Sequence, residues 1–142
     1  PNNPTATAHG AAEVADFVAR VSRSSPDTYF LIDEAYCDYV TDPSYESAIS
    51  LALSTPNVFV TRTFSKAYGM AGLRAGYAIG DPQAIKAITA YKTPYALGTL
   101  TLGGTMVSLA NQAHIDAERR RNTDARAFTI KAFADMDSLF AT

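Results

Sequence analysis

The chain has 142 residues, of which 47% are hydrophobic and 18% are charged, and it carries a net charge of -2 at pH 7. This balance is typical of a folded globular chain and excludes a disordered or strongly basic one, so we expect neither nucleic acid nor a membrane as a partner. The one cysteine, Cys37, has no partner for an internal disulfide, which favours a reducing compartment, the cytoplasm.

The first half of the chain predicts two buried strands, each preceded by a helix. Apolar residues recur every three or four positions over residues 11–21, which indicates an amphipathic helix. Residues 29–32 form a short apolar run of the kind found in buried parallel strands, and residues 58–63 are expected to form another buried strand. Between these strands we expect a short helix that ends near Leu53.

The second half predicts one more strand and then only helices. Residues 75–80 form a third strand, and Asp81 can cap a helix that has Pro82 at its first position. A loop is expected over residues 92–98. The remaining helices are expected over residues 82–91, 101–117 and 124–142, with Phe133, Met136 and Phe140 on one face of the last.

Strands that alternate with helices predict an α/β fold, with helices on the faces of the sheet. In such a sheet, ligands bind at the carboxyl ends of the strands. Polar residues cluster at two of these ends, in residues 33–36 and 63–66, and a third polar cluster lies in residues 1–5. We therefore expect the functional site to combine these three segments.

The groups around Lys66 suit a phosphate ester that carries an aldehyde. Thr63 and Ser65 offer hydroxyls, and the guanidinium of Arg74 can bind two phosphate oxygens at once. A neutral lysine amine can attack an aldehyde and form a Schiff base. A lysine taken alone is usually a solvated surface charge, so it is these neighbours that favour a site.

Three further residues suit the ring of such a ligand. Asp33 could hold a proton on a ring nitrogen and so make the ring an electron sink, or it could cap a turn. The hydroxyl of Tyr36 could contact a phenolate oxygen, or its ring could simply pack. Asn3 offers an amide donor just before Pro4, although it could equally lie in a plain loop.

Three segments, PNNPT (1–5), LIDEAY (31–36) and TFSKAYGMAGLRAGY (63–77), stand in this order in the chain. Together they resemble the fold-type I aminotransferases that depend on pyridoxal 5'-phosphate (PLP), most closely the histidinol-phosphate aminotransferase-like group. The resemblance extends over about residues 1–100. It implies part of a three-layer α/β/α large domain, with a mostly parallel sheet and helices on both faces.

The resemblance implies roles for the residues that would act on the cofactor ring. Lys66 would hold PLP as a Schiff base and later move a proton between the substrate's α-carbon and C4' of the cofactor. Asp33 would pair with the pyridinium nitrogen. Asn3 and Tyr36 would hydrogen-bond the phenolate oxygen.

The resemblance also implies a phosphate clamp and shows one departure. Thr63, Ser65 and Arg74 would hold the phosphate. Ala6 stands where the family usually has glycine, so the turn after Thr5 could differ from the family's.

The implied activity is the transfer of an amino group between an amino acid or an amino-alcohol phosphate and a 2-oxo acid, as in amino-acid biosynthesis. Two alternatives stay open: a PLP-dependent decarboxylase of the same fold, and a non-catalytic module that uses the fold for binding. A binding module would have no need of a Schiff-base lysine, which argues against the second alternative.

The resemblance implies a fragment of a longer enzyme. Residues 1–100 would be the middle of the PLP-binding large domain, and residues 101–142 would lead towards the C-terminal small domain. The family's phosphate-binding loop, ring-stacking aromatic and substrate-carboxylate arginine cannot be located in this sequence. The separate chain could therefore be inactive, and we expect the full-length enzyme to be a homodimer.

Overall fold

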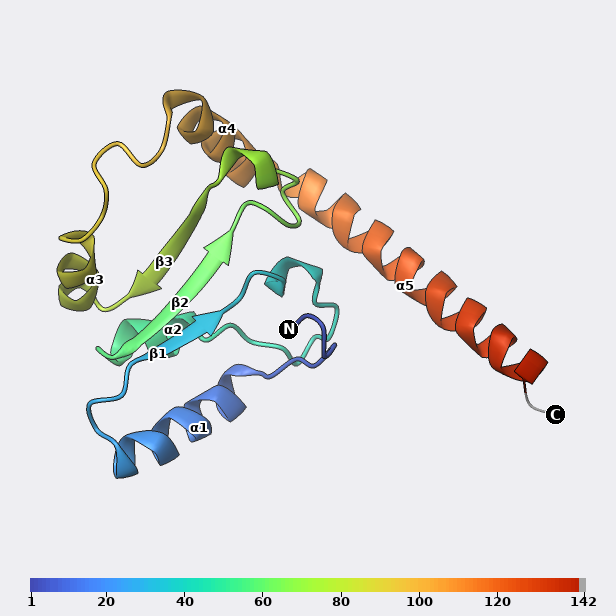
Figure 1. Cartoon of the computed structure of the whole chain (residues 1–142), viewed down its shortest axis with the longest axis horizontal. Helices are drawn as coiled ribbons and strands as arrows, with labels where there is room; N and C mark the ends of the chain where they lie inside the picture. The colour runs from blue at the N-terminus through green and yellow to red at the C-terminus, as the bar shows by residue number, and fades with distance from the viewer. Residues whose placement is uncertain (141–142) are drawn as a thin grey trace.

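The computed structural model describes the backbone of residues 1–140 and the side chains of residues 1–136. Its centre is a three-stranded sheet in the order β1 (Phe30–Asp33), β2 (Val58–Thr63) and β3 (Gly76–Gly80) (Figure 1). β1 and β2 are parallel, whereas β2 and β3 are antiparallel. The expected α/β class is confirmed, and within it the described sheet is mixed. β3 runs antiparallel because it follows β2 after a loop and a single 3-10 turn, without the crossover helix that a parallel return needs.

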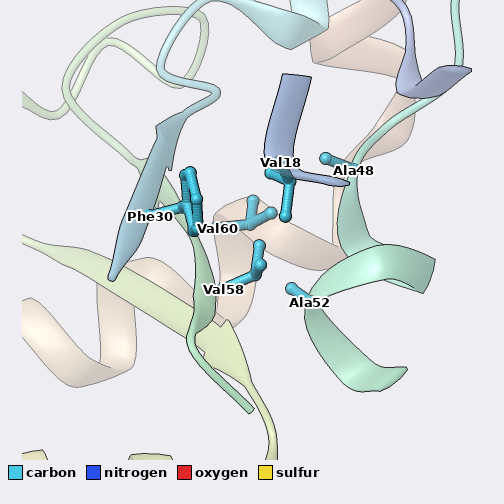
Figure 2. Packing of buried hydrophobic residues seen from close by; sticks show 6 residues of the cluster. All are labelled: Val18, Phe30, Ala48, Ala52, Val58 and Val60. Atoms are coloured by element: carbon cyan, nitrogen blue, oxygen red, sulfur yellow. The ribbon is translucent and has the colours of Figure 1, made fainter. Parts of the chain in front are cut away.

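The core lies between the sheet and two helices, α1 (Ala11–Ser24) and α2 (Ile49–Ser54). Strand side chains alternate between the two faces, so the even-numbered residues of β1 and β2 point towards these helices. The buried cluster consists of Val18, Phe30, Ala48, Ala52, Val58 and Val60 (Figure 2). The odd-numbered strand residues, including those at the polar strand ends, therefore lie on the opposite face.

The third helix begins as the sequence predicts. α3 (Pro82–Thr89) is capped by Asp81, whose Oδ1 accepts hydrogen bonds from the N–H groups of Gln83 and Ala84 at 2.9 and 3.1 Å. The helix ends at Thr89 rather than Tyr91. Tyr91 is 91% exposed, so extending the helix to this residue would not be stabilised by burial of its side chain.

The predicted boundary between the last two helices, near residues 117–124, is wrong. α4 (Thr99–Ala110) ends just before Asn111, and α5 (Gln112–Phe140) is continuous through residues 117–124. The backbone of Asn111 leaves the helical region, with φ -92° and ψ 70°, and its Oδ1 accepts a hydrogen bond from the N–H of His114 at 3.3 Å. This side chain therefore caps the start of a new helix.

α5 carries the last predicted apolar face, and that face is not buried in the described residues. The side chains of Phe133 and Met136 are 63% and 48% exposed. The side chain of Phe140 lies outside those that the structure describes. Among the described residues, no helix is both long and apolar enough to cross a membrane.

Candidate active site

The sheet places two of the predicted site residues at one edge. Asp33 ends β1 and Thr63 ends β2, and Asp33 is paired with Thr61 in the parallel register. Because parallel strands end at the same edge of a sheet, the two polar ends lie together. The chain then leaves the sheet in the loop of residues 64–75.

That loop brings the cationic side chains back to the same edge. Thr63 pairs with Gly76, so the loop opens and closes at the ends of two neighbouring strands. Lys66 follows the end of β2, and Arg74 precedes the start of β3. A pocket of about 380 Å³ lies between these ends and is lined by Asp33, Ala35, Thr61, Arg62, Thr63, Ser65, Lys66 and Arg74.

Asn3 and Tyr36 line a second pocket, of about 540 Å³, whereas Lys66 lines the first. The Lys66 Nζ atom lies over the Tyr36 ring, 5.1 Å from its centroid. The amide nitrogen Nδ2 of Asn3 donates a hydrogen bond of 3.2 Å to the Tyr36 hydroxyl. This hydrogen bond, followed by the one with Lys66, lowers the pKa of Tyr36 below its ordinary value.

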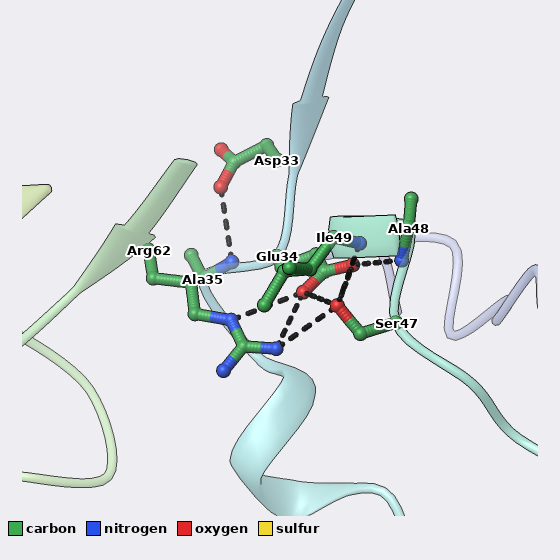
Figure 3. Close-up of polar contacts among 7 residues, drawn as sticks. All are labelled: Asp33, Glu34, Ala35, Ser47, Ala48, Ile49 and Arg62. Carbon is green, nitrogen blue, oxygen red and sulfur yellow. Dashed lines mark hydrogen bonds and ion pairs between the residues drawn. The ribbon is translucent and has the colours of Figure 1, made fainter. Parts of the chain in front are cut away.

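Asp33 both holds a turn and lines the pocket, and its expected role towards a ring nitrogen stays a prediction. Its Oδ1 accepts a hydrogen bond of 3.0 Å from the N–H of Ala35, which holds the turn after β1 (Figure 3). Its carboxylate also lines the same pocket as Lys66. Within the described side chains, this carboxylate forms no ion pair with Lys66.

Thr63, Ser65 and Arg74 differ in how many hydrogen bonds their side chains already form within the protein. Thr63 Oγ1 accepts a hydrogen bond of 3.0 Å from the N–H of Ser65, and it donates one of 3.4 Å to the Ala75 carbonyl. Nη1 of Arg74 donates a hydrogen bond of 2.8 Å to the Ala71 carbonyl, which ties the guanidinium to the loop. Ser65 is therefore the hydroxyl less engaged in holding the loop.

Two charged residues beside the site were missed by the sequence analysis. Glu34 follows Asp33, and Arg62 precedes Thr63, yet they form a salt bridge of 2.8 Å on the helix side of the sheet. The available signal was the strand alternation: charges at even positions of an otherwise apolar face require a partner. Within the described residues, no group of three or more side chains could hold a metal ion.

Comparison with known proteins agrees with this arrangement of fold and site. A family model described as aminotransferase class I and II matches residues 1–139. The chain belongs to this family of aminotransferases, whose members are transferase enzymes.

Individual relatives include histidinol-phosphate and aromatic amino acid aminotransferases. The histidinol-phosphate aminotransferase of Paracoccus denitrificans is 36% identical over 135 residues, which cover 95% of this chain and 35% of the relative. The aromatic amino acid aminotransferase of Thermobifida fusca is 41% identical over 115 residues, which cover 81% of this chain and 31% of the relative. The chain thus spans about a third of the length of these curated relatives.

A solved structure extends the likeness to three dimensions. The crystal structure of histidinol-phosphate aminotransferase from Sinorhizobium meliloti, in complex with pyridoxal-5'-phosphate, superposes with a TM-score of 0.84 at 27% identity. The superposition covers 95% of this chain and 36% of that protein. The architecture is therefore that of the PLP-dependent fold-type I aminotransferases.

Proposed function

We propose that this chain supplies the lysine-bearing part of a PLP-dependent aminotransferase. The complete protein would transfer an amino group between an amino acid or an amino-alcohol phosphate and a 2-oxo acid. The observation that carries the proposal is the position of the Lys66 amine, 5.1 Å from the Tyr36 ring centroid and in one pocket with Asp33 and Arg74. The family match favours amino-group transfer over decarboxylation or simple binding.

The polar groups of the site fit the chemistry of this cofactor. PLP presents an anionic phosphate, a ring nitrogen that can carry a proton, and a phenolate oxygen. Arg74, Ser65 and Thr63 suit the phosphate, Asp33 suits the protonated nitrogen, and Tyr36 suits the phenolate oxygen. When it is bound, the cofactor supplies an electron sink for charge that develops on the substrate's α-carbon.

The protein's own groups would bind, orient and move protons. Lys66 would bind the aldehyde carbon through its amine and, once released, carry a proton to and from the substrate's α-carbon. Asp33 would keep a proton on the ring nitrogen because a carboxylate stabilises a neighbouring cation. Asn3 would hold the Tyr36 hydroxyl towards the ring through the 3.2 Å hydrogen bond.

The Thr63 hydroxyl would act mainly through the loop rather than on the phosphate. It already bonds the N–H of Ser65 and the carbonyl of Ala75, which orients the backbone on either side of the lysine loop. Ser65 and Arg74 would then make the principal phosphate contacts. Arginine is suited to this role because its planar guanidinium can bind two phosphate oxygens.

The proposal includes finer points that the family suggests. Because histidinol-phosphate aminotransferases are among the relatives, we propose an amino-alcohol phosphate as the amino donor of the complete protein. We also propose a homodimer in the cytoplasm for the complete protein. Its assembly can be measured by sedimentation of the full-length form.

The central test is covalent labelling of the lysine. The chain is incubated with pyridoxal 5'-phosphate, reduced with sodium borohydride and digested, and the peptides are analysed by mass spectrometry. We expect the label on Lys66 and its loss in Lys66→Ala. Lys92→Ala, which removes an exposed lysine outside the pocket, is the matched control and should keep the label. Equal labelling of the Lys66→Ala chain would overturn the proposal.

A further inference from the structure

Glu34 has a fully bonded carboxylate beneath the site. Its side chain is 3% exposed and accepts hydrogen bonds from one residue of β2 and from two residues that precede α2 (Figure 3). Arg62 donates from Nε at 3.0 Å and from Nη2 at 2.8 Å. The Ser47 hydroxyl lies 2.7 and 2.9 Å from the two carboxylate oxygens, and the N–H of Ala48 donates at 2.8 Å.

These contacts join the strand ends to the start of α2. The N–H of Glu34 donates to the Thr61 carbonyl at 2.9 Å, which extends the pairing of β1 and β2 by one residue. Nη2 of Arg62 also donates to Ser47 Oγ at 3.1 Å. The carboxylate thus fixes β1, β2 and the residues that lead into α2 as one unit.

The ion pair of Glu34 and Arg62 lies next to the site in the sequence of both strands. Glu34 follows Asp33 and Arg62 precedes Thr63, so each charged residue is the neighbour of a site residue. Side chains of adjacent strand residues point to opposite faces. The ion pair therefore lies on the helix side of the sheet, while Asp33 and Thr63 lie on the other side.

Stability alone does not account for charges at this point. Further along the same face, β1 and β2 use Phe30, Val58 and Val60, which pack in the core without polar atoms. An ion pair with a buried member contributes little net stability compared with well-packed apolar side chains, because the Glu34 carboxylate loses its hydration and the Arg62 guanidinium loses part of its own. The ion pair instead fixes the relative position of the two residues, since a guanidinium and a carboxylate bond in a defined geometry.

We propose that Glu34 and Arg62 are positioning residues for the PLP site. Their ion pair holds the ends of β1 and β2 at the separation that the cofactor ring requires between Asp33 and the lysine loop. This inference rests on the proposed function. Arg62 is among the residues that line the pocket, but its guanidinium is bonded to Glu34 and Ser47. The effect therefore passes through the backbone of the neighbouring site residues.

The experiment compares Glu34→Gln with Val18→Ala, a core variant that lowers stability away from the strand ends. The first readout is hydrogen exchange at the amides of Ala35 and Ser65, which bond to the Asp33 carboxylate and the Thr63 hydroxyl. The second is the rate of Lys66 labelling by pyridoxal 5'-phosphate and borohydride, measured well below the melting temperature. The amide of Ala84, in the distant α3 cap, reports any global effect.

We expect Glu34→Gln to speed exchange at Ala35 and Ser65 but not at Ala84, and to slow labelling roughly tenfold. Val18→Ala should speed hydrogen exchange to the same extent at all three amides, and it should leave the labelling rate near that of the unchanged chain. Equal effects of the two variants on all three amides and on labelling would overturn the inference.

A double variant covers the case in which Glu34→Gln does not fold. Glu34→Gln with Arg62→Gln leaves no unpaired buried charge, so it avoids the main penalty of the single change. We expect it to fold and still to label slowly. Normal labelling in the double variant would show that charge balance alone matters and would refute a positioning role.

The outcomes separate this inference from the proposed function. If the unchanged chain is not labelled at Lys66, the proposed function fails, and the exchange at Ala35 and Ser65 still decides whether the ion pair holds the strand ends. If the unchanged chain is labelled and Glu34→Gln matches it in both readouts, only the positioning role fails.

Discussion

The amine of Lys66 lies 5.1 Å from the centroid of the Tyr36 ring, and the hydroxyl of that ring accepts a hydrogen bond from Asn3. The bond from Asn3 is the largest of the effects that lower the pKa of Tyr36. We therefore expect Asn3→Ala to raise this pKa. The measurement is a spectrophotometric titration of tyrosine ionisation, with the Tyr36→Phe spectrum subtracted.

Asn2→Ala is the matched control for that titration. The Asn2 side chain donates to Thr5 Oγ1 at 2.7 Å, so the change removes an amide from the same segment without touching the Tyr36 hydroxyl. The Tyr36 pKa should stay where it is in the unchanged chain. A pKa that moves equally in both variants would assign the effect to the segment as a whole.

Gly76 allows β3 to pair closely with β2. A Cβ at this position would lie 2.9 Å from the Arg62 carbonyl oxygen, which belongs to the backbone and has little freedom to move. We expect Gly76→Ala to lower the free energy of unfolding by about 1–3 kcal/mol. Because Gly76 pairs with Thr63, labelling of Lys66 should slow as well.

Gly72 provides the control within the same loop. A Cβ there meets nothing within 4 Å, and its φ is not positive. Gly72→Ala should therefore leave both stability and labelling nearly unchanged, as measured by urea denaturation and mass spectrometry. A loss of stability as large as that of Gly76→Ala would contradict the close-approach argument.

Ala6 stands in the left-handed region with φ 57°, where a Cβ is unfavourable by about 1–2 kcal/mol. Glycine removes this strain but loses about 0.4–1 kcal/mol through the entropy of the unfolded chain. We expect Ala6→Gly to raise the free energy of unfolding by about 0.5 kcal/mol, the small difference between these effects. Ala8→Gly, at a position without positive φ, should instead lower it, and urea denaturation of both variants checks the signs.

Burial of the thiol, and then the nearby Asp38 carboxylate, raises the pKa of Cys37 from 9.0 to about 11. A raised folded-state pKa contributes stability that is complete below about pH 9 and is lost as the pH rises towards 11. Between about pH 8 and about pH 10.5, the free energy of unfolding measured by denaturation should fall less for Cys37→Ala than for the unchanged chain. An equal fall in the free energy of unfolding for both chains would mean that the thiol does not titrate in this range.

Local signals were enough to predict the elements that form the site. The apolar runs, the Asp81 cap and the polar strand ends are all encoded by near neighbours in the sequence, and the structure places these elements close to their expected bounds. The motif around Lys66 carried the family resemblance, which the family model confirms. The individual roles of the site residues stay predictions.

The remaining features depend on contacts or backbone angles that a pattern does not encode. The helix break at Asn111 has no proline or glycine to mark it, and α5 continues past residue 117 with ion pairs of the (i, i+3) type. The partnership of Glu34 with Arg62 joins residues 28 apart through the pairing of two strands. The positive φ of Ala6 follows from the turn around it, whereas its residue type alone would predict the opposite.

The loop of residues 64–75 leaves the sheet after Thr63 and rejoins it at Gly76, and these two residues are paired. Lys66 and Arg74 therefore lie on one segment whose two ends are joined by one residue pair of the β-ladder, and whose residues Met70 and Leu73 also bond to Ser108 and Thr101 of α4. We expect this segment to be exchangeable with the corresponding loop of a relative, with the strands kept in alignment, where the contacts of Met70 and Leu73 with α4 are preserved. Chimeras built this way would graft the amine and the guanidinium together, which makes the loop a natural unit for engineering the site.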